Sequence, residues 1–583
     1  MVISGAKIVI ETLIEQGCDT VFGYPGGQVL SIFDELYINR NRIKHVLAAH
    51  EQGASHAADG YARATGKVGV VIATSGPGAT NLVTGIATAF LDSVPMVAIT
   101  GNVPCDLIGR DSFQEVDIVG ITMPVTKHNF IVKDINELAD TLRLAFKIAK
   151  SGRPGPVLVD IPKDIQVGKC EFESKAAPVV PYPLNFASEN RLAKAAELIN
   201  ECERPYIYFG GGVISGKASK ELIAFAEKID SPIGCSLMGL SAVPDDNPHF
   251  LGMQGMHGRY ASSIAEDEAD LVITLGARFS DRATGNKKRF AKNSKIIHID
   301  IDNAEIQKNI PVYLGIPGDV KDAVARLTAM VEEKKREGWT KRIEELKAIQ
   351  RESEEAAMSK SADKDCSKCT APCDKTGIPA ENRLNPYTIV DVISRYTDDD
   401  TVIATDVGQH QMWTAQRYPF RKPRTFITSG GLGTMGYGLG AAIGAAIATD
   451  KKSVLFTGDG SFGMNLNELA TAVSSDVPVV VVIMNNGVLG MVRQWQTLFF
   501  DRHYSNTTLN RKTDFVKLAE AFGAKGKRVS SIEELEAAAA EAFACDSTFV
   551  IDCVVDCDEF VLPMLPPGGS IDDIITEIKE EGK

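Results

Sequence analysis

The sequence predicts an α/β protein with three domains, each built on a doubly wound parallel sheet. Short β-branched apolar runs alternate with helical stretches and are bounded by glycine, which is typical of repeated strand–helix–strand units. The runs lack strict polar alternation, as expected of parallel strands that are covered on both faces. This rhythm occurs three times along 583 residues, a length that suits about three or four domains.

The first block contains three such runs before a proline-bearing stretch. They are GVVIAT (69–74), PMVAIT (95–100) and PVLVDI (156–161), and a helical pattern at 78–93 separates the first two. The N-terminal segment, MVISGAKIVIETLIEQG, lacks the basic region and cleavage site of a secretory signal. We expect it to form an amphipathic first helix instead. APVVPYPLN (177–185) then predicts a linker.

The second and third blocks repeat the pattern. The second includes the runs 205–212, 270–276 and 295–302 and ends in a strongly charged helical segment. The third is bounded by NPYTIVDVI and FVIDCVVD, and a proline-rich tail follows it. We therefore expect a first domain at 1–170, a central domain at 186–345, a charged linker at 346–384, a third domain at 385–556 and a tail at 557–583.

Composition and charge exclude several classes of protein. Apolar residues make up 44% and charged residues 24% of the chain, the balance of a globular protein. The 76 acidic and 62 basic residues leave a formal charge of −14, which argues against nucleic-acid binding. No apolar run reaches the roughly eighteen residues of a membrane span. Most cysteines lie in apolar segments, so we expect reduced thiols in a cytoplasmic protein.

The sharpest chemical pattern lies in the third block. The apolar strand SVLFT leads into Gly458-Asp459-Gly460, and the next apolar strand, PVVVVIM, ends in Asn485-Asn486. Because the carboxyl ends of parallel strands meet at one edge of a sheet, we expect Asp459 and Asn486 to face one crevice. Their oxygens suit Mg²⁺, and the glycines let a diphosphate approach the backbone. A turn with a strand-end cap is the alternative, but with this spacing the pair resembles the thiamine diphosphate-binding motif.

A second glycine pattern favours another cofactor when it is taken alone. The segment from Gly431 to Gly436 matches a dinucleotide fingerprint, and Asp459 follows it as a candidate ribose ligand. The preceding segment, PRTFITSG, is a poor parallel strand, and glycine continues at 438, 440 and 444. That continuation predicts a helix packed closely on a neighbour, so NAD binding is the weaker hypothesis.

Thiamine diphosphate also needs a carboxyl group hydrogen-bonded to its aminopyrimidine ring, preferably in an apolar pocket that raises its pKa. Glu51 is the best candidate in the first block, because it follows the apolar run VLAA and opens a helix from Gln52. It is therefore expected at the carboxyl end of a strand, facing the crevice. The alternative is a helix N-terminal acid that the helix dipole stabilises.

With both features present, nearly the whole chain resembles the acetolactate synthase (acetohydroxyacid synthase) family of thiamine diphosphate-dependent enzymes. Such enzymes have a pyrimidine-binding first domain, a central domain and a diphosphate-binding third domain. The motifs that carry the resemblance are Gly23-Tyr24-Pro25-Gly26-Gly27, SGPGATN (75–81), GNVP (101–104), SFQE (112–115), KHN (127–129), IPKD (161–164), GMHG (255–258), GGLGTMG (430–436), LGMVRQWQ (489–496) and LPMLPPGGS (562–570).

The resemblance implies roles for the matching positions. The catalytic positions are Glu51, Gly27, Gln114 and Lys163. The positions that contact thiamine diphosphate are Pro25, Gly26, Gln409, His410, Gly433, Met435, Gly460, Ser461, Gly490 and Met491. The metal ligands are Asp459, Asn486 and the carbonyl of Val488. Phe113, Arg282, Val492 and Trp495 would contact substrate, and Gly211, Gly212, His257, Arg282, Asp300 and Asp319 would contact FAD that takes no part in redox chemistry.

The implied reaction is decarboxylation of pyruvate and transfer of the hydroxyethyl unit to a second pyruvate or to 2-ketobutyrate, the first common step of branched-chain amino-acid synthesis. The products are acetolactate and acetohydroxybutyrate. A different 2-keto acid decarboxylase, oxidase or diketone hydrolase of the same superfamily is the alternative. The family further implies a homodimer or homotetramer, with the cofactor between two chains, and a small regulatory subunit.

Two departures from the family pattern stand out. Gln28 occupies a position where the family usually has alanine, which bears on the acceptor site. An insertion at 361–382 carries Cys366, Cys369 and Cys373 in a polar loop, at spacings that suit zinc or an iron–sulfur cluster. A solvent-exposed linker with redox-sensitive thiols is the alternative for that insertion.

Overall fold

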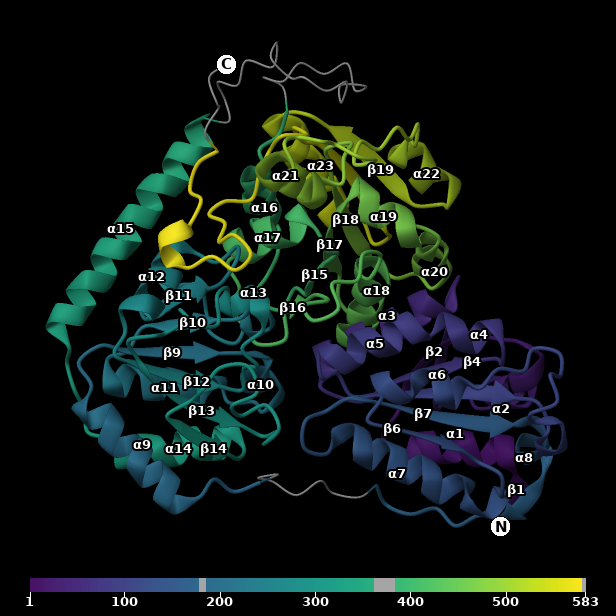
Figure 1. Ribbon diagram of the computed structural model, residues 1–583. Helices are drawn as coiled ribbons and strands as arrows, with labels where there is room; N and C mark the ends of the chain where they lie inside the picture. The colour runs from purple at the N-terminus through teal and green to yellow at the C-terminus, as the bar shows by residue number, and fades with distance from the viewer. Residues whose placement is uncertain (178–184, 361–382, 579–583) are drawn as a thin grey trace.

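A computed structural model describes residues 1–177, 185–360 and 383–578 of the protein (Figure 1). Three parallel sheets of six strands dominate these residues, and a small antiparallel pair joins β1 (Val2–Ser4) to β8 (Lys169–Glu171). The predicted α/β class with three doubly wound sheets is confirmed. No helix in the described ranges is both long and apolar enough to cross a membrane.

The first sheet has helices on both faces. Its strand order is β3 (Lys44–Leu47), β2 (Thr20–Tyr24), β4 (Gly69–Ala73), β5 (Met96–Asn102), β7 (Pro156–Pro162) and β6 (His128–Ile131). One apolar cluster joins the sheet to α1 (Gly5–Glu15), α2 (Leu30–Ile38) and α7 (Leu138–Lys150). The other joins it to α3 (Glu51–Thr65) and α5 (Val83–Leu91). The helix expected at 78–93 is two helices, α4 (Pro77–Asn81) and α5, because the Leu82 N–H turns back tightly to the Ala79 carbonyl.

The central sheet is assembled in the same way. Its order is β11 (Phe250–Met253), β10 (Ile233–Cys235), β9 (Pro205–Phe209), β12 (Leu271–Leu275), β13 (Lys295–Asp300) and β14 (Leu314–Pro317). Helices α9 (Glu189–Glu201), α11 (Ser219–Ile229) and α14 (Val320–Met330) cover one face. Helix α12 (Tyr260–Glu268) covers the other, and the charged helix α15 (Glu337–Lys360) packs outside it.

The third sheet carries the predicted metal motif. Its order is β16 (Phe426–Ile427), β15 (Ile403–Thr405), β17 (Ser453–Gly458), β18 (Val479–Asn485), β20 (Phe549–Val554) and β19 (Lys525–Val529). Helices α16 (Pro386–Ser394), α17 (Gln409–Arg417) and α23 (Ile532–Ala544) lie on one face. Helices α18 (Gly438–Thr449) and α22 (Phe515–Ala521) lie on the other. The segment expected to be a poor strand forms only the two-residue edge strand β16.

The first and third domains meet through α3 and α18, which lie side by side (Figure 1). A side chain at Gly440 would place its Cβ 2.7 Å from the Gly53 carbonyl oxygen, and a Cβ at Gly444 would come still closer to the Ala57 carbonyl oxygen. Gly440 and Gly444 are therefore required by the contact, which confirms the predicted close packing of this helix.

The C-terminal tail lies between the central and third domains (Figure 1, yellow). The Leu565 N–H donates to the Met256 carbonyl (2.7 Å), and the Val561 N–H donates to Gln494 Oε1 (2.9 Å). The tail therefore links the central domain to α21 (Gly490–Phe499) of the third domain.

Candidate active site

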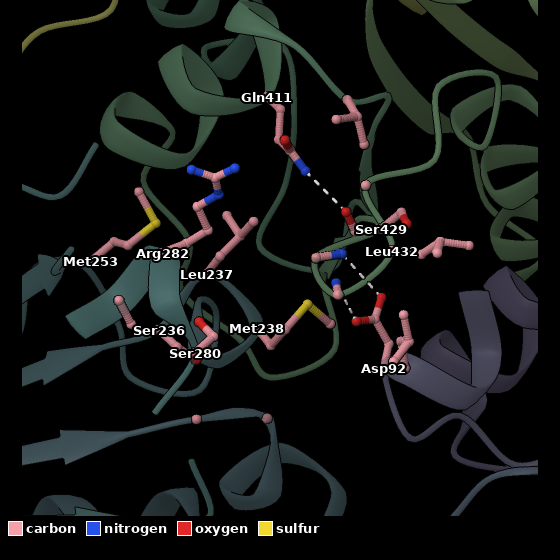
Figure 2. Close-up of a pocket in the computed structure, with 18 of the residues that line it drawn as sticks. Asp92, Ser236, Leu237, Met238, Met253, Ser280, Arg282, Gln411, Ser429 and Leu432 are labelled. Carbon is pink, nitrogen blue, oxygen red and sulfur yellow. Dashed lines mark hydrogen bonds between the residues drawn. The ribbon is translucent and has the colours of Figure 1, made fainter. Parts of the chain in front are cut away.

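A cavity of about 1140 Å³ lies where the three domains meet, at the carboxyl ends of strands in the central and third sheets. Figure 2 views the middle of this cavity, with Met253 and Arg282 of the central domain on one side and Gln411 and Ser429 of the third domain on the other. Asp92 enters it from the first domain. Crevices at the carboxyl edges of parallel sheets are where such folds bind ligands.

The predicted metal ligands lie together at one end of the cavity. Asp459 begins α19 (Asp459–Asn465) directly after β17, and Asn486 follows β18, the neighbouring strand. Both line the cavity together with Val488. Burial raises the pKa of Asp459 to about 7. A divalent cation would favour the ionised carboxylate, so this acid fits a metal ligand.

A polar shell surrounds these ligands. Asn486 Nδ2 donates to Gln409 Oε1 (3.2 Å), and Gln409 Nε2 donates to the Glu559 carbonyl of the tail (2.9 Å). The Ser461 hydroxyl donates to the Val407 carbonyl (3.0 Å). Burial lowers the pKa of His410 to about 3, and its Nε2 has no hydrogen-bond partner. A buried orphan nitrogen beside the cavity fits an incoming phosphate or water oxygen.

Glycine keeps this end of the cavity open. Gly458 lies so close to the His410 ring that an added Cβ would be 3.0 Å from Nδ1. Gly490 is packed against the Gln409 side chain, and a Cβ at Gly460 would meet Leu489 at 2.8 Å. Gly433 and Met435 line the same region from the loop 430–436. These positions leave the backbone accessible to a bulky anion such as a diphosphate.

The central domain forms the other end of the cavity. Gly211 and Gly212 begin α10 (Gly211–Ser215) after β9, and the Gly212 N–H donates to the Gly276 carbonyl (3.1 Å). His257 is buried with an orphan Nδ1, and burial lowers its pKa to about 4. Asp300 ends β13, and Asp319 caps α14. All of them line the cavity, as a nucleotide crevice requires.

Arg282 and Trp495 connect the two ends. The Arg282 guanidinium lies 5.5 Å from the centre of the Trp495 ring, within the range of a cation–π contact. Met491 and Val492 precede Trp495 on α21, and all three line the cavity. Arg282 is largely exposed and pairs only distantly with Asp281, so its guanidinium is available to a ligand carboxylate.

A second cluster lies on the first domain and does not line this cavity. Lys163 Nζ donates to the Gly27 carbonyl (2.6 Å), and the Gln28 N–H donates to the Thr74 hydroxyl (3.2 Å). Gly26 lies directly against Thr74. These contacts connect the loop after β2 to the carboxyl ends of β4 and β7.

Glu51 belongs to this second cluster. It begins α3, as expected, and Asn81 Nδ2 donates to its Oε2 (2.9 Å). A Cβ at Gly78 would lie 3.2 Å from Glu51 Oε1. Glu468 of α20 (Glu468–Ser474) accepts from the Ala49 N–H nearby, and burial, with a further contribution from the Glu51 charge, raises its pKa.

The remaining first-domain positions are exposed or half-buried. Phe113 is 86% exposed, although it is a large apolar side chain. Gln114 adopts a positive φ of 60° and packs its backbone on Gly76. Pro25 is exposed as well. The predicted site residues therefore form two groups in one chain: those of the central and third domains share a cavity, and those of the first domain form an open face.

The structure also adds residues that no sequence pattern indicated. Arg153 of the first domain lines the cavity, where it donates to Glu305 of the central domain (2.7 Å) and to the Ser93 hydroxyl (2.7 Å). Met238 lines it from the loop after β10 (Figure 2). Their positions depend on how the domains pack, so only a comparison of related chains would have shown them. The predicted cysteine site, Cys366, Cys369 and Cys373, lies outside the described residues.

Comparison with known proteins defines the class of this chain. The family described as "Thiamine pyrophosphate enzyme, N-terminal TPP binding domain" matches residues 3–121, the corresponding central domain matches 192–327, and the C-terminal TPP binding domain matches 406–553. Thiamine pyrophosphate is thiamine diphosphate. The chain is therefore a thiamine diphosphate enzyme, and both ends of the chain belong to domains that bind this cofactor.

Full-length relatives narrow the class further. The chain is 45% identical over 590 residues to a probable acetolactate synthase large subunit of Methanocaldococcus jannaschii, covering 99% of this chain and 96% of that protein. It is 43% identical to the acetolactate synthase isozyme 1 large subunit of Escherichia coli, with 98% of each chain covered. It is 42% identical to the acetolactate synthase large subunit of Haemophilus influenzae, with 99% of each covered. The chain belongs to the acetolactate synthase large subunit family.

Proposed function

We propose that this chain decarboxylates pyruvate and joins the hydroxyethyl unit to a second pyruvate or to 2-ketobutyrate. The observation that carries the proposal is the convergence of Asp459, Asn486 and the Gln409–His410 shell on one end of a large cavity. It is the arrangement that a metal-bound diphosphate needs, and full-length kinship to acetolactate synthase large subunits supplies the reaction class.

Mg²⁺ fits the Asp459 end of the cavity. Asp459 and Asn486 would supply side-chain oxygens and Val488 its carbonyl, and diphosphate oxygens would complete the octahedron that Mg²⁺ prefers. The bound thiazolium supplies an electron sink for loss of carbon dioxide. Gln409, His410, Gly460, Ser461 and Gly490 would hold the diphosphate, and Met435 would support the rings from the loop 430–436.

The acid that acts on the aminopyrimidine is Glu51. It holds a carboxyl group at the carboxyl edge of the first sheet, with Asn81 to orient it. Lys163 and Gln114 lie on the same open face as Gly26 and Gly27, where a substrate would enter. Because this face does not line the cavity of its own chain, we propose that it closes over the third domain of a second chain.

Exposed apolar side chains on the two surfaces support that assembly. Tyr24, Leu47 and Phe113 are exposed on the first domain, and Leu432 and Met464 are exposed on the third. Large apolar groups that remain open in one chain are typical of surfaces that a partner covers. A homodimer is the smallest assembly that completes both sites, and a homotetramer would contain two such pairs.

FAD fits the central end of the cavity. Gly211 and Gly212 permit close approach of a pyrophosphate at a helix N-terminus, and the orphan His257 Nδ1 faces the same space. Asp300 and Asp319 lie at the ends of adjacent strands, where they suit ribose hydroxyls. The flavin would have a structural role here, since the proposed reaction transfers no electrons to an acceptor.

Acceptor recognition would depend on Arg282 and Trp495. The guanidinium fork suits a 2-keto acid carboxylate, and the Trp495 ring suits the extra methyl group of 2-ketobutyrate. Phe113 and Val492 would line the same channel. Gln28, a longer side chain than the usual alanine, would narrow the acceptor side. The relatives are named large subunits, and we propose that a small regulatory subunit joins this chain also.

A product assay tests the proposal. The purified protein is mixed with pyruvate, with and without thiamine diphosphate, Mg²⁺ and FAD, and acetolactate, acetate and acetaldehyde are measured. We expect acetolactate as the main product, and none of it when thiamine diphosphate or Mg²⁺ is left out. Acetate or acetaldehyde as the main product would instead place the chain among the oxidases or simple decarboxylases.

A further inference from the structure

The loop 430–436 is attached to the first domain of its own chain. Asp92 follows α5 and reaches across the domain boundary, so that its Oδ2 accepts from the Gly430 N–H (3.0 Å) and its Oδ1 accepts from the Gly431 N–H (2.7 Å). Figure 2 shows both contacts. The Asp92 side chain is fully buried, whereas Gly430 and Gly431 are exposed. A buried carboxylate that binds two exposed loop amides is a strong local anchor.

A charged network holds Asp92 in place. Arg63 of α3 donates to Asp92 Oδ2 (2.9 Å) and to Asp59 Oδ1 (2.5 Å). Tyr437, which directly follows the loop, donates to the same Asp59 oxygen (2.5 Å). All four side chains are nearly or fully buried. Arg63 therefore orients the carboxylate of Asp92 independently of the loop amides.

The anchor acts on the part of the loop that carries Gly433 and Met435. The Thr434 hydroxyl pairs with Thr88 of the first domain (2.8 Å). From the third domain, the Ser429 hydroxyl accepts from the Thr434 N–H (3.1 Å), and Asn465 donates to the Gly436 carbonyl (2.8 Å). A Cβ at Gly431 would lie 2.8 Å from Asp92 Oδ1, so glycine allows this close approach. The position of Met435 is thus set from two domains.

We propose that Asp92 is a positioning residue for the cofactor loop of its own chain, so that each first domain serves two cofactor sites. Glu51 acts on the cofactor held by the partner's third domain, and Asp92 fixes the loop beside the cofactor held by its own third domain. This inference rests on the proposed function, because it requires a cofactor site shared between two chains.

The first test is the variant Asp92→Asn. An asparagine can accept from only one loop amide, its NH₂ group opposes the other, and it loses the charge that pairs with Arg63. We expect the thiamine diphosphate concentration for half-maximal activity to rise about tenfold, with less effect on kcat at saturating cofactor. Tyr437→Phe is the matched control, because it removes an interdomain hydrogen bond of the same network and leaves the loop amides bound.

Tyr437→Phe distinguishes positioning of the loop 430–436 by Asp92 from general stabilisation of the interface between the two domains. We expect Tyr437→Phe to keep half-saturation within about twofold of the parent. An unchanged value for Asp92→Asn, or an equal rise in both variants, would overturn the inference. If Asp92→Asn does not fold, Thr88→Val removes the Thr434 contact without disturbing Arg63, and a rise of about threefold is expected at an unchanged melting temperature. No rise in that variant would also count against the inference.

Hybrid dimers give the sharper test. Chains carrying Glu51→Gln and Asp92→Asn bear different affinity tags, are produced together and are isolated as the mixed dimer. One site then combines the altered Glu51 position with the altered loop anchor, and the other site has both groups intact. We expect about half of the parent turnover with the parent's half-saturation. Residual turnover with the raised half-saturation of Asp92→Asn would overturn the assignment of Asp92 to its own chain's site.

A second hybrid distinguishes failure of the inference from failure of the proposed function. Mixing Glu51→Gln with Asp459→Asn restores one intact site only if the cofactor lies between chains. If this pair regains about half of the parent turnover while the Asp92 pair does not, the inference alone is wrong. If the pair with Asp459→Asn stays inactive, the shared site is wrong, and the inference is overturned with it.

Discussion

In the proposed function, the third-domain crevice and the first-domain face carry the two halves of one chemistry, and they differ in how complete they are within a single chain. Asp459 lies buried in the crevice, and Asn486, beside it, is hydrogen-bonded to Gln409. Glu51 lies half-buried on a face where Phe113 remains 86% exposed. The crevice is preorganised by its own domain, whereas the face still needs a covering surface.

That difference has a physical cause. Neighbouring strands β17 and β18 place Asp459 and Asn486 at one sheet edge, so local topology alone brings the two proposed metal ligands together. Among the described residues, no strand pairing joins the first sheet to the third. The environment of Glu51, and with it the apolar surroundings that would tune its pKa, depends on which surface is placed over it.

The largest expected effect comes from removing the acid on the open face. Glu51→Gln keeps the hydrogen-bonding shape of the side chain but cannot exchange a proton with the aminopyrimidine. We expect turnover of pyruvate to fall by about 10²–10⁴-fold, with little change in melting temperature. Acetolactate formation under saturating cofactor measures the effect. Retention of most activity would show that the face does not supply the acid.

The next effect tests the crevice. Asp459→Asn replaces the charged group of the proposed metal site with a neutral one, so we expect Mg²⁺ and thiamine diphosphate to bind about 100-fold more weakly. The parent protein should melt at a higher temperature when both are added, because a ligand at 100 times its Kd stabilises the folded state by about 2.7 kcal/mol. The variant should lose most of this shift. Asp552→Asn, a buried acid of the neighbouring strand β20 that does not line the cavity, is the matched control.

A smaller effect is expected where the cavity meets substrate. Trp495→Leu removes ring surface that would contact the extra methyl group of 2-ketobutyrate, a contact worth about 10-fold or more in discrimination. Competition between pyruvate and 2-ketobutyrate, read as the ratio of acetohydroxybutyrate to acetolactate, should shift toward acetolactate. The Phe499 ring centroid lies 5.6 Å from that of Trp495, so Phe499→Leu is the control. It should leave the ratio of acetohydroxybutyrate to acetolactate nearly unchanged. Equal ratios in the parent and Trp495→Leu would remove Trp495 from the acceptor site.

The smallest effect concerns a buried acid outside both regions. Glu266 of α12 is buried, its Oε1 has no hydrogen-bond partner, and burial raises its pKa to about 8. A raised pKa means that Glu266 stays protonated up to a higher pH in the folded state than in the unfolded state. The stability from Glu266 is therefore full below about pH 4.5 and is lost as the pH rises through 8.

Glu266→Gln has no group that ionises at this position, so it should not lose stability as the pH rises. We expect the variant to unfold at a similar temperature to the parent at pH 5 and at a temperature several degrees higher at pH 9, a gain on the order of 1–3 kcal/mol. Thermal unfolding at the two pH values measures it, with Glu268→Gln on the same helix as the control. An equal rise in melting temperature at both pH values would show that Glu266→Gln stabilises the protein through packing and not through the lost charge.

Much of the cavity lining could be predicted from sequence because it follows local rules. Apolar runs marked the strands, and polar groups after β17 and β18 marked the crevice. The glycine spacing of α18 indicated close packing, and the structure shows α3 as the partner. The same rules do not reach Arg153 or Asp92, which have ordinary surroundings in sequence. They become part of the cavity only because loops of the first domain are placed against Glu305 and the loop 430–436.

The sequence by itself determined the three α/β sheets, since apolar periodicity encodes them directly. Its short-range spacing also predicted the Asp459–Asn486 motif, and its longer motifs carried the resemblance to the enzyme family. The tertiary structure alone decided that Glu51 does not line the cavity that holds Asp459 in its own chain and that Asp92 binds the loop 430–436. Those placements depend on how whole domain surfaces fit together. Such complementarity is spread over many distant residues and leaves no local pattern.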